Sequence, residues 1–117
     1  MTNHRRPSIS THVLDTERGE PAEGVPVRLS RWEGNKLVRL ADAETDADGR
    51  IRDLLDERLE AGAYQLAFDV AAYFREQTGD VSFFSRVVLD FEVLDTDRHY
   101  HVPLLLSRFS CASYRGS

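Results

Sequence analysis

The feature that most constrains the fold is a series of short segments in which apolar and polar side chains alternate. Within residues 8–15, Ile9 and Val13 lie on one face, whereas Ser10 and His12 lie on the other. A period of two residues is typical of a strand that buries one face. The pattern predicts further strands of similar length, at residues 25–32, 37–45, 50–54, 63–70, 86–94, 99–106 and within 108–117.

Turn-forming residues separate these segments. Gly, Pro, Asn and Asp gather between them, at residues 16–24, 34–35, 46–49 and 95–97. Asp48-Gly49 is a dipeptide typical of a hairpin turn. The one helix candidate covers residues 70–77 and ends at Gly79. Short strands, closely spaced turns and one short helix together predict an all-β protein, an antiparallel β-sandwich.

Length and composition limit the class of protein. The 117 residues suit one domain, and we expect a flexible N-terminal tail at residues 1–8 and the domain at residues 9–117. A net charge of −5 argues against nucleic acid as a partner, because such proteins present a clustered positive surface. The single cysteine, Cys111, excludes an intrachain disulfide. With no secretory signal and no apolar run long enough to span a membrane, we expect a soluble cytoplasmic protein.

The histidines leave several interpretations open. His99 and His101 share one face of a strand and form a possible metal pair, but zinc needs three or four ligands and no companion stands at ligand spacing. Both can equally be polar positions on a half-exposed strand. His12 is a hydrogen-bonded structural residue unless the fold brings it to His101. Two imidazoles beside an arginine can move protons and stabilise an oxyanion.

Arg50 also has two interpretations. It follows the Asp48-Gly49 turn and is either a solvated charge at the end of a hairpin or a fixed cation aimed at a developing negative charge. The acidic run from Glu44 to Asp48 only imitates a calcium loop, since the position that requires a bidentate Glu is Leu55.

Signatures of a covalent nucleophile are absent from the sequence. There is no Gly-x-Ser-x-Gly elbow, no Gly-rich phosphate loop, and no flanking motif of a cysteine nucleophile at Cys111. If the protein is a hydrolase, an activated water is therefore the favoured nucleophile.

Several motifs resemble the 5-hydroxyisourate hydrolases, the transthyretin-related enzymes of urate breakdown. The longest are ISTHVLD at residues 9–15, TDADGR at 45–50, HYHVPLLLS at 99–107 and YRGS at 114–117. Shorter matches are Gly62-Ala63-Tyr64, Ala72-Tyr73-Phe74 and Phe83-Phe84. The resemblance covers residues 8–117. The terminal YRGS is the most specific motif, because the hormone-carrying transthyretins share the fold but lack that ending.

The resemblance implies a fold, an assembly and a reaction. The fold is a transthyretin-like sandwich of two four-stranded sheets with one short helix. The assembly is a homotetramer whose active sites lie in a channel at the dimer–dimer interface. The reaction is hydrolysis of the N1–C6 amide bond of 5-hydroxyisourate to 2-oxo-4-hydroxy-4-carboxy-5-ureidoimidazoline, and it needs no cofactor and no metal.

The resemblance also implies site residues. The catalytic group is His12, Arg50, His101 and Ser117, and the residues that shape substrate binding are Tyr114, Arg115 and Gly116. A histidine takes a proton from water, and Arg50 stabilises the oxyanion. We expect His99 to lie beside the site without a role in it. The stretch FSCA at residues 109–112 departs from the family pattern, but it removes no expected site residue.

Two other functions remain as alternatives. A non-catalytic, transthyretin-like carrier would bind a small apolar ligand in the same channel, and it predicts a channel face without His12 and His101 and a dispensable tail. A β-sandwich that only recognises another protein would leave those histidines unexplained.

Overall fold

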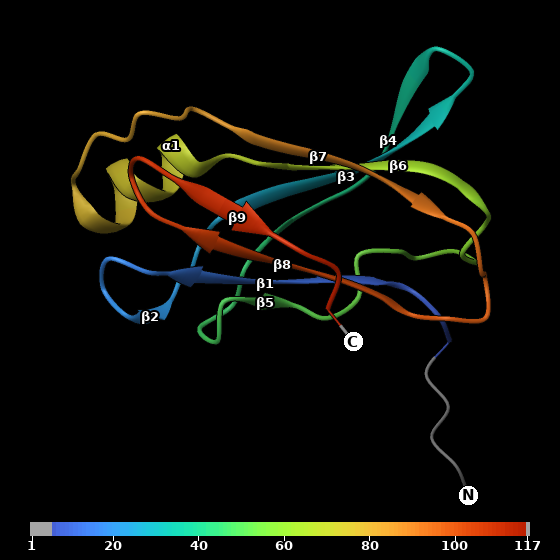
Figure 1. The fold of residues 1–117 in the computed structure, drawn as a ribbon, viewed down its shortest axis with the longest axis horizontal. Helices are drawn as coiled ribbons and strands as arrows, with labels where there is room; N and C mark the ends of the chain where they lie inside the picture. Colours follow the sequence, from blue (N-terminus) through green and yellow to red (C-terminus); the bar gives the residue numbers. More distant parts are fainter. Residues whose placement is uncertain (1–5, 117) are drawn as a thin grey trace, which may run out of the picture.

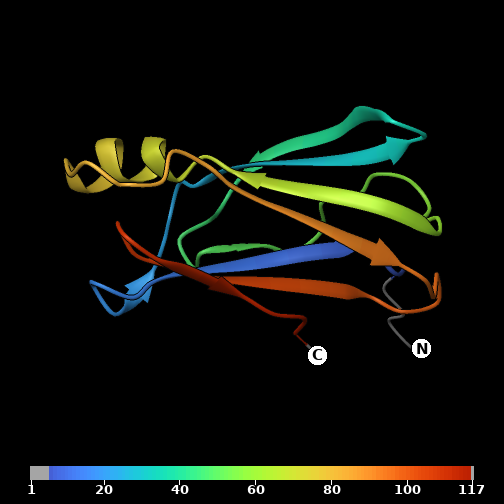
Figure 2. The ribbon, with the colours of Figure 1, turned by 45° about the horizontal axis from the view of Figure 1, so that its top comes forward.

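The computed structural model describes residues 6–116, which form two layers of β-sheet (Figure 1, Figure 2). One sheet has the order β2-β1-β8-β9, with β5 paired to β1. Its strands are β1 (Ile9–Asp15), β2 (Glu20–Pro21), β5 (Arg50–Ile51), β8 (Tyr100–Leu106) and β9 (Cys111–Ser113). The other sheet has the order β4-β3-β6-β7. Its strands are β3 (Pro26–Glu33), β4 (Lys36–Glu44), β6 (Gly62–Phe68) and β7 (Val87–Val93).

The core lies between the two sheets and follows the predicted alternation. Ile9 and Val13 of β1 are fully buried, as are Leu66 and Phe68 of β6 in the opposite sheet. The side chains between the buried positions of β1, including His12, point to the outer face. The all-β sandwich expected from the sequence is confirmed. Because β1 packs only its inner face into the core, its outer face can carry functional side chains.

The helix is short and lies at one end of the sandwich (Figure 2). It begins as an α-helical turn, α1 (Val70–Tyr73), and continues as a π-helical turn, η1 (Phe74–Thr78). The Asp69 carboxylate caps its start, and Gly79, with φ 76°, ends it in the left-handed region. This confirms the helix predicted from the sequence. Within residues 6–116 no helix has the length and apolar character needed to cross a membrane.

The pairing of β1 with β8 differs from the expected antiparallel arrangement. These two strands run parallel, and Ser10 lies opposite His101. The first sheet also has five strands rather than four, because the two-residue strands β2 and β5 both pair with β1. Periodicity shows which residues share a face, but the direction of a strand depends on the path of the chain between the sheets.

The Asp48-Gly49 turn does not close a hairpin. It connects β4 in one sheet to β5 in the other, so the strands on either side of it are not partners. Gly49 has φ 74°, and a Cβ there would lie 2.4 Å from the main-chain oxygen of Val13. Asp48-Gly49 therefore lets the chain pass close to β1, because glycine adopts a positive φ and has no side chain to collide with Val13.

The start of the domain lies earlier than predicted. Ser8 is only 2% exposed, and its main-chain oxygen accepts a hydrogen bond from Tyr100 N at 2.9 Å. Arg6 forms an ion pair with Asp53 at 3.2 Å. The predicted tail therefore does not include these residues, and its remaining part, residues 1–5, lies outside the described residues.

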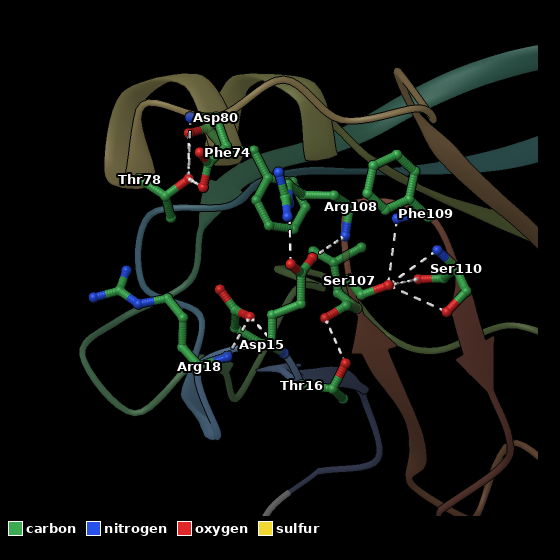
Figure 3. Close-up of polar contacts among 12 residues, drawn as sticks. Asp15, Thr16, Arg18, Phe74, Thr78, Asp80, Ser107, Arg108, Phe109 and Ser110 are labelled. Carbon is green, nitrogen blue, oxygen red and sulfur yellow. Dashed lines mark hydrogen bonds and ion pairs between the residues drawn. The ribbon is translucent and has the colours of Figure 1, made fainter.

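A polar cluster connects the end of β1 to the helix and to the β8–β9 turn (Figure 3). The fully buried Asp15 accepts hydrogen bonds from the Tyr73 hydroxyl at 2.7 Å and from the main-chain N–H groups of Glu17 and Arg18. Burial, and then the Asp15 carboxyl group, raise the pKa of Tyr73 far above its usual value. Glu17 in turn accepts from the Arg108 side chain at 3.0 Å. The cluster holds this end of the sandwich together.

Candidate active site

Three of the expected site residues lie on the outer face of the first sheet. His12 of β1 pairs with Arg50 of β5, and His101 of β8 lies opposite Ser10, two residues before His12. Strands β5, β1 and β8 are neighbours in this layer (Figure 1). His12, Arg50 and His101 are all half-buried. The fold therefore brings together residues that are far apart in the sequence.

Ser10 connects His101 of β8 to His99, which lies just before that strand. Its hydroxyl oxygen lies 2.7 Å from His101 Nδ1 and 2.8 Å from His99 Nε2. His99, which we expected to lie beside the site without a role, is therefore hydrogen-bonded within the same network. Sequence reasoning missed Ser10 as a site residue. Its one signal was its position two residues from His12, on the same face of a predicted strand.

Gly116 holds the C-terminal segment against His101. Its main-chain N–H donates to the carbonyl oxygen of His101 at 2.8 Å. A Cβ at position 116 would lie 2.6 Å from His101 Cδ2 and 3.3 Å from Pro103 Cγ. Only glycine therefore lets the chain approach the imidazole this closely. The next residue, Ser117, lies outside the described residues.

Arg115 anchors the C-terminal segment on β8. Its guanidinium stands 4.5 Å from the centre of the Tyr100 ring, a cation–π contact. Tyr114 and Arg115 both line a depression of about 290 Å³ beside β7 and β8.

The turn before β5 leaves the Arg50 guanidinium without a carboxylate. One oxygen of the Asp46 carboxylate accepts from the main-chain N–H groups of Asp48 and Arg50, and the other binds Arg52 at 2.9 Å. Arg52 also reaches Asp48 at 3.5 Å. Among residues 6–116, no acidic side chain forms an ion pair with Arg50. The local acids are thus neutralised by Arg52, and Arg50 presents its charge to the outer face.

The surroundings of His12 and His101 both favour the neutral imidazole. Burial, followed by the charge of Arg50, lowers the pKa of His12, while a main-chain hydrogen bond at Asp48 and the carboxylates of Asp48 and Asp46 act in the opposite direction. Burial, followed by Arg50, His12 and His99, lowers the pKa of His101. Neutral imidazoles can accept a proton or donate a hydrogen bond, so the face suits proton transfer next to a stabilised anion.

The metal interpretation of His99 and His101 finds no third ligand. Across the described part of the chain, no group of three or more His, Cys, Asp or Glu residues is placed to hold a metal ion. Both imidazoles already hydrogen-bond to Ser10.

Sequence comparison gives a consistent family. Residues 9–116 match the profile described as HIUase/Transthyretin family. A 5-hydroxyisourate hydrolase of Deinococcus radiodurans is 46% identical over 121 aligned residues, with 100% of both chains covered. A 5-hydroxyisourate hydrolase of Caulobacter vibrioides is 44% identical over 112 residues, which cover 93% of this chain and 97% of that relative.

Comparison with solved structures finds the same fold in proteins with different names. Klebsiella pneumoniae 5-hydroxyisourate hydrolase superposes with a TM-score of 0.84 at 40% identity, covering 95% of this chain and 99% of the other. Sea bream transthyretin in complex with thyroxine superposes with a TM-score of 0.86 at 32% identity, covering 92% and 93%. The fold alone therefore does not separate the two kinds of protein, and the side chains on the outer face must do so.

Proposed function

This chain belongs to the HIUase/transthyretin family, and from that premise we propose that it hydrolyses 5-hydroxyisourate in urate degradation. The observation that carries the proposal is the meeting of His12, Arg50 and His101 on one face of the first sheet. Two imidazoles with lowered pKa values, and an arginine that forms no ion pair with an acidic side chain of residues 6–116, supply a base and an anion-stabilising cation. These are the groups that hydrolysis of an amide by water requires.

The proposed reaction needs four bond changes. A neutral histidine removes a proton from water, and the water oxygen forms a bond to C6 of the substrate. Arg50 stabilises the negative charge that develops on the C6 oxygen. The C6–N1 bond then breaks, and N1 takes up a proton from the imidazolium. The product is 2-oxo-4-hydroxy-4-carboxy-5-ureidoimidazoline, and the histidine returns to its neutral form.

The alternative function is a carrier of a small apolar ligand. The relationship to a thyroxine-bound transthyretin at 32% identity keeps this alternative in view. The outer face argues against it, because Arg50, His12 and His101 make that face polar and positively charged. The higher identity to hydrolases, 44% and 46%, points the same way.

The C-terminal segment completes the proposed site. Gly116 brings the chain against His101, and in this proposal Ser117, the next residue, helps position water or substrate. Tyr114 and Arg115 shape the site indirectly, since Arg115 anchors the segment on Tyr100.

The proposal includes a cytoplasmic homotetramer with sites at the dimer–dimer interface. The outer face is half-buried and not enclosed, so a second copy would be needed to exclude water from it. Several large apolar side chains are exposed and can pack between copies, namely Val81, Phe83, Phe109 and Tyr114. Light scattering should give about four times the chain mass of 13.3 kDa, and a monomer would contradict this assembly.

A direct assay tests the proposed activity. The chain is added to freshly prepared 5-hydroxyisourate, and the loss of ultraviolet absorbance is compared with the spontaneous rate in the same buffer. We expect clear acceleration that scales with protein concentration. Acceleration no greater than that produced by an unrelated protein would overturn the assignment.

A further inference from the structure

Four groups form a continuous hydrogen-bonded chain that ends at the site. The main-chain N–H of Ser8 lies 3.3 Å from His99 Nδ1, and His99 Nε2 lies 2.8 Å from Ser10 Oγ. Ser10 Oγ then lies 2.7 Å from His101 Nδ1. The parallel pairing of β1 and β8 creates this row, since it places Ser10 opposite His101 and Ser8 beside the start of β8.

The first group sets the direction of the next hydrogen bond in the row, between His99 and Ser10. A main-chain N–H can only donate, so His99 Nδ1 accepts and carries no proton. Neutral His99 therefore holds its proton on Nε2 and donates it to Ser10 Oγ. The Ser10 oxygen has two acceptor sites, so accepting from His99 leaves the direction toward His101 open; with the one Ser10 hydroxyl hydrogen donated to His101 Nδ1, every donor in the row has an acceptor. His101 must then carry its own proton on Nε2.

We infer that Ser8, His99 and Ser10 form a positioning chain that holds His101 as the Nε2–H tautomer, so that His101 donates a hydrogen bond to the developing anion and His12 is the base. This inference rests on the proposed function. It also settles the roles of two histidines that the proposed reaction left interchangeable. An imidazole whose outer nitrogen already bears a proton cannot accept the proton of water there. A neutral imidazole in this state can polarise a carbonyl as a hydrogen-bond donor.

The surroundings of His12 support the same division of roles. Burial and the charge of Arg50 lower the pKa of both imidazoles. At His12 alone, a main-chain hydrogen bond at Asp48 and the carboxylates of Asp48 and Asp46 act in the opposite direction and favour the protonated form. His12 is thus the imidazole that can hold an extra proton during the reaction.

The proton balance closes with one base. Water gives a proton to His12 as its oxygen bonds to C6, while Arg50 and the Nε2–H of His101 share the charge on the C6 oxygen. When the C6–N1 bond breaks, N1 takes its proton from the His12 imidazolium. His101 stays neutral throughout, so Ser10 and His99 orient it without losing protons of their own.

Nuclear magnetic resonance of ¹⁵N-labelled histidine tests the tautomer directly. Long-range ¹H–¹⁵N correlations distinguish a protonated Nδ1 from a protonated Nε2, and loss of one signal set in His101→Gln assigns the residue. We expect His101 as Nε2–H in the wild type, a mixture of tautomers in Ser10→Ala, and no change in Thr11→Val. The last is a matched control, because Thr11 donates to the Val102 carbonyl at 2.7 Å on the opposite face of the same strand pair. Nδ1–H in the wild type, or an unchanged tautomer in Ser10→Ala, would overturn the inference.

Kinetics test whether the tautomer matters. Ser10→Ala and His99→Leu should each lower kcat on the order of tenfold, roughly the effect of losing one orienting hydrogen bond, with KM nearly unchanged. His99→Gln should restore most of the rate, because its amide N–H can replace the Nε2–H donor to Ser10. Equal losses in His99→Gln and His99→Leu, or wild-type kcat in Ser10→Ala, would contradict the positioning role. An inactive wild type with the expected tautomer would instead overturn the proposed function.

Discussion

Strand β1 carries polar side chains into two different surroundings. At its end, Asp15 is fully buried, and its oxygens accept hydrogen bonds from Tyr73, Glu17 and Arg18. In its middle, His12 faces outward and is half-buried. The first cluster is complete, since each buried oxygen of Asp15 has donors within the domain. The second gathers His12, His101 and Arg50, and within residues 6–116 no acidic side chain forms an ion pair with the Arg50 guanidinium.

The difference separates stability from function. A buried carboxyl group whose donors come from the helix and from the loop after β1 strengthens the fold, and its removal leaves those donors unpaired. Neutral imidazoles beside the Arg50 guanidinium add little to the fold, and their lowered pKa values record the cost of charging them there. A negative charge that develops on a bound substrate would stabilise a protonated imidazole there and so offset that cost. The following predictions test this division, from the largest effect to the smallest.

Arg50→Ala should lower the hydrolysis rate about 10²–10³-fold, because it removes the group that stabilises the oxyanion. Arg52→Ala is the matched control, since Arg52 binds the turn carboxylates two residues away. Initial rates and thermal unfolding are measured on both variants. The control should keep nearly the wild-type rate, and similar losses in the two variants would show that the turn, not the Arg50 charge, is responsible.

Asp15→Ala should lower the free energy of unfolding by about 2–4 kcal/mol, because the Tyr73 hydroxyl and two main-chain N–H groups lose their acceptor. Denaturant unfolding measures this loss. Asp42→Ala is the control, and it should cost at most about 1 kcal/mol since its ion pairs with Arg28 and Arg39 are exposed. If Asp15→Ala remained as stable as Asp42→Ala, the structural role of the cluster would be wrong.

Gly116→Ala should lower kcat on the order of tenfold by displacing the His101 ring, since a misplacement of about 1 Å can cost up to about 10²-fold. The added methyl would lie 2.6 Å from His101 Cδ2. Cys111→Ala, on the exposed strand β9, controls for general effects at this end of the chain. An unchanged rate in Gly116→Ala would mean that the tail does not set the position of the imidazole.

The pH profile should follow the neutral imidazoles. A histidine base with a lowered pKa stays unprotonated at pH values somewhat below the ordinary histidine pKa of about 6.5. The value of kcat/KM should therefore fall only at more acidic pH. A rate loss centred above pH 6.5 would contradict the neutral base.

The same lowered pKa values give folding stability a small pH dependence. The unfolded chain binds protons at His12 and His101 before the folded chain does, so the free energy of unfolding should be complete above about pH 6.5 and decline as the pH falls below it. Denaturant unfolding at pH 7.5 and 5.5 measures the decline. His12→Gln/His101→Gln should remove most of it, and an equal decline in that variant would assign the effect to other groups.

Much of the fold could be predicted from the sequence, because alternation reports directly on which face of a strand is buried. The outward position of His12 and the short helix before Gly79 followed from local pattern alone. The parallel direction of β8 and the crossing at Asp48-Gly49 could not, since the same local residues allow other connections.

The candidate site was predicted less completely than the fold. The resemblance pointed to Arg50, His12 and His101, but their meeting depends on the pairing of three strands. Ser10 and His99 were missed because their role lies in hydrogen bonds across β1 and β8, which no spacing along the chain records.

One measurement tests the division between the two regions of β1 most directly. His12→Gln/His101→Gln is compared with the wild type for the rate of 5-hydroxyisourate loss and for the midpoint of thermal unfolding, in the same samples at pH 7.5. We predict that the catalysed rate falls to the spontaneous rate, while the midpoint stays within a few degrees. A variant that unfolds early, or one that still accelerates hydrolysis as the wild type does, would contradict the account.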